Sequence, residues 1–444
     1  MNRYWAGLAA FAALGIAAVV ILFARAGRDI AAPDVTDFVL ERPDIAPEAN
    51  SYTHFLAATN GFFWPTNSTF VADYLDGQPV SEELIANLAA ENAGLIDVIR
   101  QGADCGVCLT PEVTSFDTLT PYLSPWRNMG KFMALMTRYD RLAGRYAEAT
   151  DACVTLLRFG DLVQTDAGCL IDYLVGISIV ELGLNQARDL ACDTALPRDD
   201  LKRLVVALTE VGPFAPGLVR AIKVEFRVVA QTVDDFVAGR FSLSDILGDG
   251  WLRHIGKGRR LPGYFFQPNK TLNDFATLYR DAITNVPLTY SAMKKYDTDA
   301  FVGTVSDRLP RVVRPNAVGS LLGDLVVPAL DNILERKCRL ECSANATLLI
   351  AGINLFKKDT GHVPGELADL VPAYLAAVPL DPYDGEPFHY APAEGLVYAV
   401  GKDVKDSGGS TLVPGSYAGD KPSSQRWEAE DVVFRFEAQP PEKP

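Results

Sequence analysis

The sequence has few of the residues that catalysis and metal binding use most often. It contains only four histidines in 444 residues: His54, His254, His362 and His389. None of them stands in a metal-binding spacing such as H-E-x-x-H. The nearest approach to a nucleophile elbow, residues 176–180 (GISIV), lacks the final glycine of G-x-S-x-G. Residues 256–258 (GKG) likewise fail the G-K-[ST] ending of a phosphate loop. No local motif therefore indicates a reaction.

Positive charge is also scarce. The 41 lysines and arginines are outnumbered by 56 aspartates and glutamates, which gives a net charge of −15. A polyanion repels the phosphate backbone, so we expect no nucleic-acid partner. The local exception is a basic cluster made of Arg253, His254, Lys257, Arg259 and Arg260. This cluster is either a solvated loop or a contact for anionic lipid or an acidic partner.

Long apolar runs are missing, with one exception near the N-terminus. Residues 5–24 form a run of 20 residues without a charge. As a helix, such a run spans about 30 Å, which is the thickness of the hydrocarbon core of a bilayer. A cleaved signal peptide is the alternative, since residues 24–26 (ARA) have the small-x-small form of a cleavage site. We predict a transmembrane signal anchor over residues 1–28, single-pass in the cell inner membrane, with the body in the periplasm or otherwise outside the cytoplasm.

The sequence contains seven cysteines, an odd number for a protein in an oxidising compartment. Cys105 and Cys108 form a C-x-x-C pattern, which occurs in local disulfides, in redox pairs and in halves of zinc sites. No second C-x-x-C completes a set of four zinc ligands. We therefore predict a local disulfide between Cys105 and Cys108, with a thiol–disulfide role for this pair as an alternative.

Most of the chain between the predicted anchor and residue 335 has a helical pattern. Residues 29–80 are predicted to be a tether and irregular segment, because residues 25–50 are rich in proline, aspartate and alanine. Residues 81–335 are predicted to form a large helical domain, in which apolar side chains recur at helical spacing. At residues 144–149 (GRYAEA) the joint between two helices resembles the turn of a tetratricopeptide hairpin. There the glycine would let the helices approach, with Tyr146 and Ala149 packed between them. An ordinary helical bundle is the alternative, since no regular repeat is clear.

The last hundred or so residues have a different pattern. An amphipathic helix is predicted over residues 345–358 (NATLLIAGINLFKK). It is followed by the segments LVPAYL, VPLDP and GEP between residues 366 and 387. Short strands are predicted over residues 388–391, 396–400 and 431–437, with an Asp/Gly-rich loop at residues 401–409.

This order of elements resembles the globular head of the major pseudopilins of type II secretion systems. The resemblance covers roughly residues 340–437 and implies a small α+β domain with an antiparallel sheet. We place this domain at residues 336–437, followed by a disordered tail at residues 438–444. The resemblance also implies partners in the cell envelope, among them secretion-system components.

The chain departs from this family in two respects. Residues 1–24 contain no glutamate, whereas the family has one five residues into its mature apolar helix. In addition, roughly 300 residues separate the predicted anchor from the predicted head, whereas a pilin has one continuous helix there. We therefore expect the head to be present without assembly into a filament.

In this family the corresponding loop binds calcium, so the resemblance implies a calcium site here. Its ligands would be Asp403, Asp406, Glu430 and Asp431. Calcium takes six to eight oxygen ligands, and the loop glycines would let backbone carbonyls approach it closely. An Asp/Gly turn without a metal is the alternative, because two lysines and a long insert stand among these carboxylates.

The sequence thus predicts a mainly α protein with an N-terminal transmembrane helix, a large helical domain and a small C-terminal α+β domain. Its predicted function is that of a membrane-anchored, extracytoplasmic scaffold or binding protein that catalyses no reaction. The first alternative is an exported enzyme of unknown reaction whose site is assembled in the helical domain. The second is the thiol–disulfide role of Cys105 and Cys108.

Overall fold

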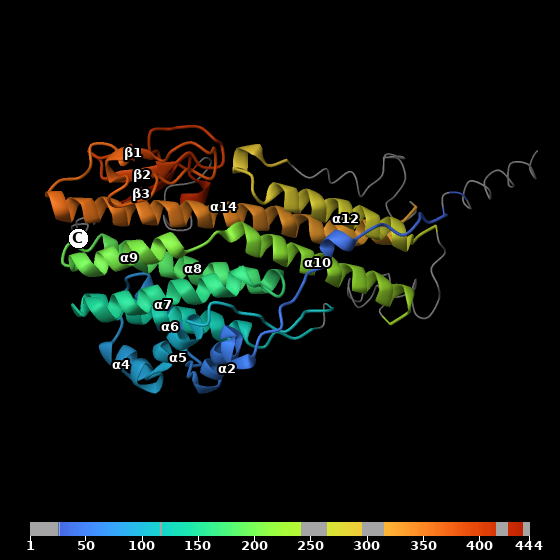
Figure 1. Cartoon of the computed structure of the whole chain (residues 1–444), viewed down its shortest axis with the longest axis horizontal. Helices are drawn as coiled ribbons and strands as arrows, with labels where there is room; N and C mark the ends of the chain where they lie inside the picture. The colour runs from blue at the N-terminus through green and yellow to red at the C-terminus, as the bar shows by residue number, and fades with distance from the viewer. Residues whose placement is uncertain are drawn as a thin grey trace, which may run out of the picture.

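The computed structural model describes residues 25, 27–115, 118–240, 264–294, 315–413 and 425–437, and for residues 321, 324–329 and 331 it describes the backbone only. This part of the chain is mainly helical, with one small antiparallel sheet near its C-terminal end (Figure 1). The predicted mainly α class with a small sheet is therefore confirmed. The predicted transmembrane run, the basic cluster at residues 253–260 and the predicted tail lie outside the described residues.

The centre of the molecule is a bundle of helices that follow one another along the chain. They are α6 (Leu123–Leu142), α7 (Tyr146–Thr165), α8 (Leu170–Ala191), α9 (Arg198–Glu210) and α10 (Phe214–Val237). The predicted joint at residues 144–149 does connect two helices. Gly144 has a left-handed backbone there (φ +75°), and a Cβ placed on it would meet nothing within 4 Å. The glycine therefore serves the turn and not a close helix approach. Ala149 is buried as predicted, whereas Tyr146 is only half-buried.

Helices α7 and α8 pack with their backbones in contact. A Cβ at Gly176 would lie 2.5 Å from the backbone nitrogen of Gln164, and one at Gly160 would lie 2.6 Å from that of Val180. Real side chains do not approach so closely, so only glycine fits at these two positions. The glycine that begins residues 176–180 thus belongs to a helix crossing.

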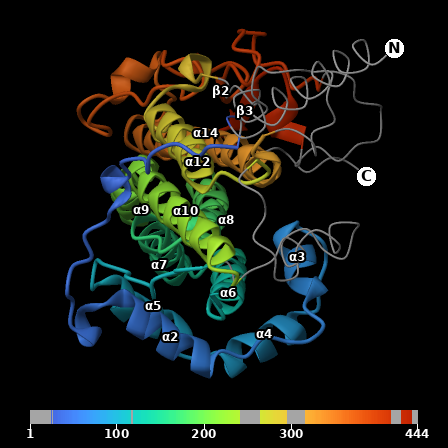
Figure 2. The same ribbon diagram turned by 90° about the vertical axis from the view of Figure 1, so that its right-hand side faces the viewer.

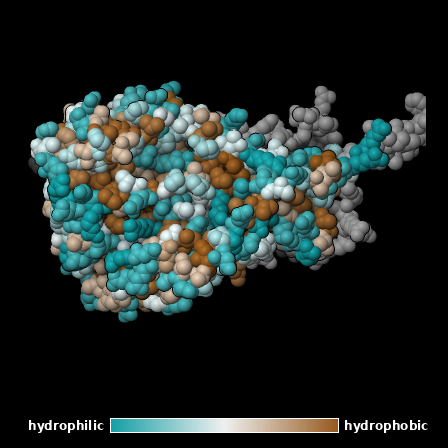
Figure 3. Space-filling model, in the orientation of Figure 1, coloured by the Kyte–Doolittle hydropathy of each residue, from teal (hydrophilic) through white to brown (hydrophobic). Residues whose placement is uncertain are grey.

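Two stretches of the described residues are long and apolar enough to cross a membrane by length and composition, Leu170–Ala191 and Arg198–Val237. The first is α8, whose Tyr173 and Leu184 are fully buried in the bundle. The second is divided between α9 and α10. Figure 3 shows a surface on which hydrophilic residues alternate with hydrophobic ones. The burial of α8 identifies it as a core helix of the bundle.

One long helix connects the helical part to the C-terminal region. Helix α14 (Ala317–Thr360) has 44 residues, which corresponds to a length of about 66 Å. It lies against α8, α9 and α12 (Pro268–Asn285) and also against the sheet (Figure 1). We call the described residues up to 294 the body, and the described residues of 361–437 the head. The predicted boundary between residues 335 and 336 falls inside α14, so the backbone continues from body to head without a break.

The head contains a three-stranded antiparallel sheet. Its strands are β1 (His389–Ala391), β2 (Leu396–Ala399) and β3 (Val432–Arg435), in the order β1-β2-β3. Leu396 of β2 pairs with Ala391 on one side and with Arg435 on the other. The three predicted strands are therefore confirmed to within a few residues, as is the antiparallel sheet.

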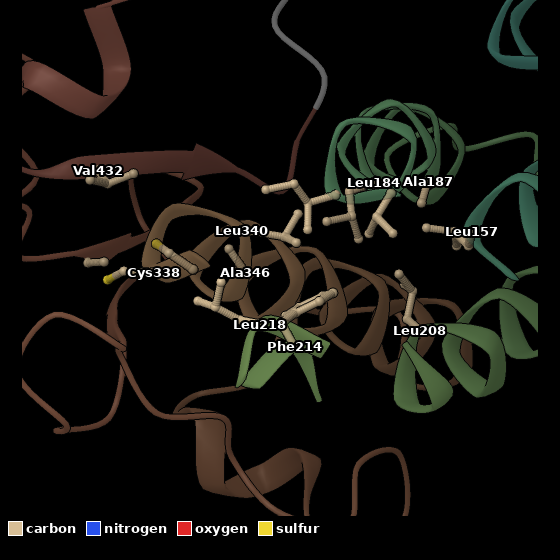
Figure 4. Close-up of a cluster of buried hydrophobic side chains, with 14 of the residues drawn as sticks. Leu157, Leu184, Ala187, Leu208, Phe214, Leu218, Cys338, Leu340, Ala346 and Val432 are labelled. Carbon is tan, nitrogen blue, oxygen red and sulfur yellow. The ribbon is translucent and has the colours of Figure 1, made fainter. Parts of the chain in front are cut away.

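The body and the head share one hydrophobic core. Its buried side chains run from Leu157 and Leu184 in the bundle, through Leu340 on α14, to Val432 and Phe434 in the sheet. Figure 4 shows side chains of this cluster converging from the bundle, from α14 and from the sheet. Because apolar burial stabilises body and head through the same contacts, they form one structural unit.

Four short helices form an outer layer on the other side of the bundle. They are α2 (Ser51–Gly61), α3 (Thr69–Leu75), α4 (Glu82–Glu91) and α5 (Leu95–Ala103). Figure 2 shows them as an arc along one edge of the molecule. Phe55 and Ile99 are fully buried in this layer and pack with Trp126 of the bundle. Helices α2 and α3 lie within residues 29–80, which were predicted to be irregular. They form because Phe55 of α2 and Val71 of α3 pack against an apolar surface supplied by residues distant in sequence.

The segment after the predicted anchor also differs from the extended tether expected from its composition. Residues 29–40 lie along the body and cross α10 and α12 (Figure 1). The Asp29 carboxylate accepts the backbone N–H of Asn269 at 2.8 Å, at the N-terminus of α12. Phe38 is buried, with its ring 3.8 Å from that of Phe226. Hydrogen bonding and aromatic burial therefore dock a segment that carries three aspartates and a proline.

Candidate functional site

The structure places the four predicted calcium ligands around one loop of the head, with Asp431 at its centre. Asp431 is fully buried. Its carboxylate accepts backbone N–H groups from Ser407 (3.2 Å), Gly409 (2.8 Å) and Ser410 (2.9 Å). A ring of N–H dipoles stabilises an anion and opposes a cation at the same place. Asp431 therefore holds the loop together as an internal hydrogen-bond acceptor.

The other three carboxylates are engaged in the same manner. Asp406 accepts the backbone N–H of Gly408 at 2.9 Å, and Asp403 accepts that of Lys405 at 3.2 Å. Glu430 accepts a hydrogen bond from the hydroxyl of a loop serine at 2.7 Å. Among the residues that the structure describes, no three His, Cys, Asp or Glu side chains are placed to hold a metal ion. In this structure these carboxylates accept hydrogen bonds from the chain itself and do not form the calcium site that the resemblance implies.

A lysine supplies positive charge beside this loop. The Lys402 ammonium lies 2.8 Å from Glu335 of α14 and 2.9 Å from Glu428 of η7 (Arg426–Glu428). Arg339 of α14 also pairs with Glu428, at 2.8 Å. Burial acts to lower the pKa of Lys402, but Glu335 and Glu428 outweigh it and raise that pKa above its ordinary value. The chain itself thus provides the cation that ties the loop to α14.

The predicted disulfide is not formed in this structure, since all seven cysteines are free. Cys105 is partly exposed, and its Sγ lies 3.7 Å from the carbonyl of Glu48. Cys108 is fully buried, and its backbone N–H donates to Asp166. Burial, with a smaller contribution from Asp166, raises the pKa of the Cys108 thiol well above its usual range. A buried thiol held in its neutral form is a poor nucleophile, which argues against a redox role for this pair.

A buried carboxylate that the sequence did not single out lies at the start of α8. Asp172 of α8 is fully buried and accepts hydrogen bonds from the Thr110 hydroxyl (2.8 Å), the Gly168 backbone (3.0 Å) and the Tyr122 hydroxyl (3.3 Å). Burial raises the pKa of Asp172, although these donors act in the opposite direction. The group ties the loop before α6 to the start of α8, and its donors are fully explained by that structural role.

A cavity of about 1050 Å³ lies between the body and the head. Its walls come from α6 and the end of α8 in the body, and from η7 and β3 in the head. Five arginines line it: Arg138, Arg141, Arg188, Arg426 and Arg435. We call this cavity the arginine cleft. It gathers positive charge in a chain whose net charge is −15.

Aspartates compensate the positive charge on the body side of the arginine cleft. Arg138 lies 3.6 Å from Asp189, and Arg141 lies 3.4 Å from Asp193. Both acids stand at or just beyond the end of α8, where the Tyr146 hydroxyl also donates to Asp193 at 3.3 Å. The charges of these two arginines are therefore largely compensated within the protein.

Arg188 joins α8 to α14 at the edge of the cleft. One guanidinium nitrogen donates to Ser343 Oγ at 2.9 Å and to Thr347 Oγ1 at 2.6 Å. The other terminal nitrogen lies 3.4 Å from Glu181. These contacts fix the guanidinium of Arg188, so the arrangement can present an oriented cation to a ligand.

Comparisons with protein-family models, with curated proteins and with solved structures found no match to this chain. The geometry alone therefore defines its class. It is a mainly helical protein that carries a small antiparallel sheet on a long helix and holds an arginine-lined cavity between the two parts.

The arginine cleft was not predicted, and no local signal could have revealed it. Its residues come from four elements that are separated by up to about 300 positions in the sequence. No two of them form a spacing associated with ligand binding. The acidic loop, by contrast, could be located from the sequence because its residues lie close together there, whereas the backbone N–H groups that bond to its carboxylates could not.

Proposed function

We propose that this chain is a membrane-anchored, extracytoplasmic scaffold or binding protein with a pseudopilin-like head, and that it catalyses no reaction. The observation that carries the proposal is the single core shared by body and head. A shared core holds the surfaces of both parts at a fixed distance and angle. Fixed spacing between surfaces is what a scaffold requires of its fold.

The docking of residues 29–40 supports a position close to the membrane. In this proposal the apolar run at residues 5–24 spans the inner membrane, and the chain emerges directly before Asp29. Because Asp29 and Phe38 are already bound to α12 and α10, the end of the body that carries these helices would face the bilayer. The arc of short helices and the head would then remain available to partners in the cell envelope.

The packing of α14 supports a head that does not assemble into a filament. In a pilin, the long helix that precedes the head is available to pack against neighbouring subunits. Here α14 is covered by α8, α9 and α12 of the same chain. Leu340, Leu349 and Ile353 on this helix are buried. We therefore propose partners among envelope proteins, including secretion-system components, that recognise the assembled surface of body and head.

Fractionation of cells that express the full chain tests the anchoring. We expect the full chain in the inner-membrane fraction after alkaline washing, and degraded by protease added to spheroplasts. A variant that replaces residues 5–24 with a cleavable signal peptide should be released as a periplasmic protein. Recovery of the full chain in the wash, or its protection from external protease, would contradict the proposed position.

Cross-linking in intact cells tests the scaffold role. A photo-reactive residue placed at exposed Val371 in the head should capture envelope proteins, and the same residue at Leu84 in the outer layer serves as a second probe. The proposal loses its support if neither position captures an envelope protein while the chain is correctly anchored.

A further inference from the structure

The arginine cleft holds more positive charge than the protein compensates. The acids that line it are already engaged. Asp189 and Asp193 pair with Arg138 and Arg141 of α6 inside the cleft. Glu437 pairs with Lys357 at 2.8 Å, and Asp431 is bonded to the loop of the head. Arg188 of α8 is paired in part with Glu181, and the two arginines without an ion pair among the described residues, Arg426 and Arg435, lie on the head side of the cleft.

Arg426 is the most distinctive of these cations. Its guanidinium makes no hydrogen bond or ion pair with any residue in the described part of the chain. It lies instead over the ring of Phe434, 4.7 Å from the ring centre, and Arg188 lies 5.4 Å from the same centre. The fold thus holds two guanidinium groups against one aromatic ring, and Glu181 compensates their charge in part. Burial, followed by the nearby charge of Arg188, lowers the pKa of Arg426.

Arg435 adds a third cation at the mouth of the cleft. It is the exposed last residue of β3, which is an edge strand of the sheet. Within the described residues its side chain has neither a carboxylate partner nor a hydrogen bond. Because Arg435 is exposed, its charge carries little desolvation penalty. Its side chain lines the cavity that Arg426 also lines.

We propose that the arginine cleft binds a small organic polyanion whose carboxylate or phosphate groups pair with Arg426 and Arg435. Guanidinium groups recognise both anions by paired N–H···O hydrogen bonds, and stacking on an aromatic ring orients them in advance. A cavity of about 1050 Å³ is large enough for a whole small molecule. The oriented side chain of Arg188, which lies against the same Phe434 ring, provides a further contact. This binding site requires neither the membrane anchor nor the scaffold role.

Calorimetric titration of the purified full chain in detergent tests the proposal. Citrate serves as the carboxylate probe and pyrophosphate as the phosphate probe. We expect saturable binding of one molecule per chain for at least one probe, weakened by added salt. Preference for citrate would assign a polycarboxylate, and preference for pyrophosphate would assign a phosphorylated ligand. Absence of binding for both probes would overturn the proposal.

Substitutions of the arginines test whether the probe binds in the cleft. The double variant Arg426→Gln/Arg435→Gln should weaken binding by about tenfold or more. Arg158→Gln is the control, because it removes an exposed arginine that does not line the cleft and should leave the affinity unchanged. Equal affinity in the double variant and the wild type would overturn the site.

A single exposed substitution keeps the test decisive if the double variant does not fold. Arg435→Gln changes only an exposed side chain on an edge strand, so its melting temperature should match that of the wild type. It should still weaken the binding of the preferred probe severalfold, and Arg435→Lys should restore part of it. Unchanged affinity in folded Arg435→Gln would contradict the proposed ligand position.

Discussion

Replacement of Asp431 by alanine should destabilise the protein, because this carboxylate is the buried acceptor of three loop N–H groups. The N–H groups of Gly409 and Ser410 lie at 2.8 and 2.9 Å from its Oδ2 and are partly buried. The N–H group of Ser407 is exposed, so water can replace the hydrogen bond that it loses when Asp431 is removed. An unsatisfied buried donor costs at least about 1 kcal/mol, which gives about 2 kcal/mol for the two. We therefore expect Asp431→Ala to lower the free energy of unfolding by about 2 kcal/mol.

The assay is equilibrium unfolding in urea, followed by tryptophan fluorescence. Trp427 reports on the head, since its ring lies 6.3 Å from that of Phe434. Asp403→Ala is the matched control, because Asp403 is exposed and, among the described residues, its carboxylate bonds only to Lys405 within its own turn. We expect this control to change stability by less than about 0.5 kcal/mol. Equal effects of the two substitutions would refute the assigned role of Asp431.

Calcium provides a second arm of the same experiment. Because N–H donors surround the loop carboxylates, the urea midpoint of the wild type should be the same in chelator and in millimolar calcium. A calcium-dependent rise in the wild type that disappears in Asp431→Ala would show that this carboxylate binds the metal. It would also restore the calcium site expected from the resemblance.

Three further predictions concern buried glycine, carboxylate and thiol groups. Gly176→Leu should lower the free energy of unfolding by about 3 kcal/mol or more, or prevent folding, because any side chain there meets the α7 backbone. Thermal melting measures the effect, and Gly61→Ala is the control because its Cβ meets nothing within 4 Å. Burial raises the pKa of Asp381 to about 6, above its value in the unfolded chain, so the folded state binds this proton more tightly. The free energy of unfolding should therefore fall by about 3 kcal/mol as pH rises from about 4 to above 6. Asp381→Asn should remove most of this dependence in urea titrations, and an identical pH profile would contradict the assignment. An alkylating reagent should modify Cys105 but not Cys108 in the native protein, whereas a disulfide found by mass spectrometry in the purified protein would contradict the free thiols.

Local patterns in the sequence were sufficient to predict much of the head. The strand at residues 432–435 begins with β-branched and aromatic residues, and the helix over residues 345–358 has a regular apolar face. Such features depend on near neighbours, so they can be recognised without the fold. The start of α14 could not be recognised in this way, because a proline normally ends a helix and α14 continues through Pro328.

Tertiary contacts determine the features that the sequence did not reveal. The composition of residues 29–40 favours an extended tether, but the segment docks because Phe38 meets Phe226 across nearly two hundred residues. The arginine cleft depends on α6, α8 and the head meeting in space, and in the sequence its arginines appear separately as ordinary helix and strand residues. The same limitation explains the calcium prediction. The sequence located the acidic loop but could not show that backbone N–H groups occupy its carboxylates.

Native-state hydrogen exchange, measured by mass spectrometry at increasing urea concentrations, tests the central claim that body and head form one unit. Peptides that cover β2 in the head and α8 in the body are compared, because both contribute to the shared core. The shared core predicts that their exchange converges on the same free energy of opening and the same dependence on urea. Full exchange of β2 through a separate opening of much lower free energy, while α8 stays protected, would contradict a single unit and remove the main support for a rigid scaffold.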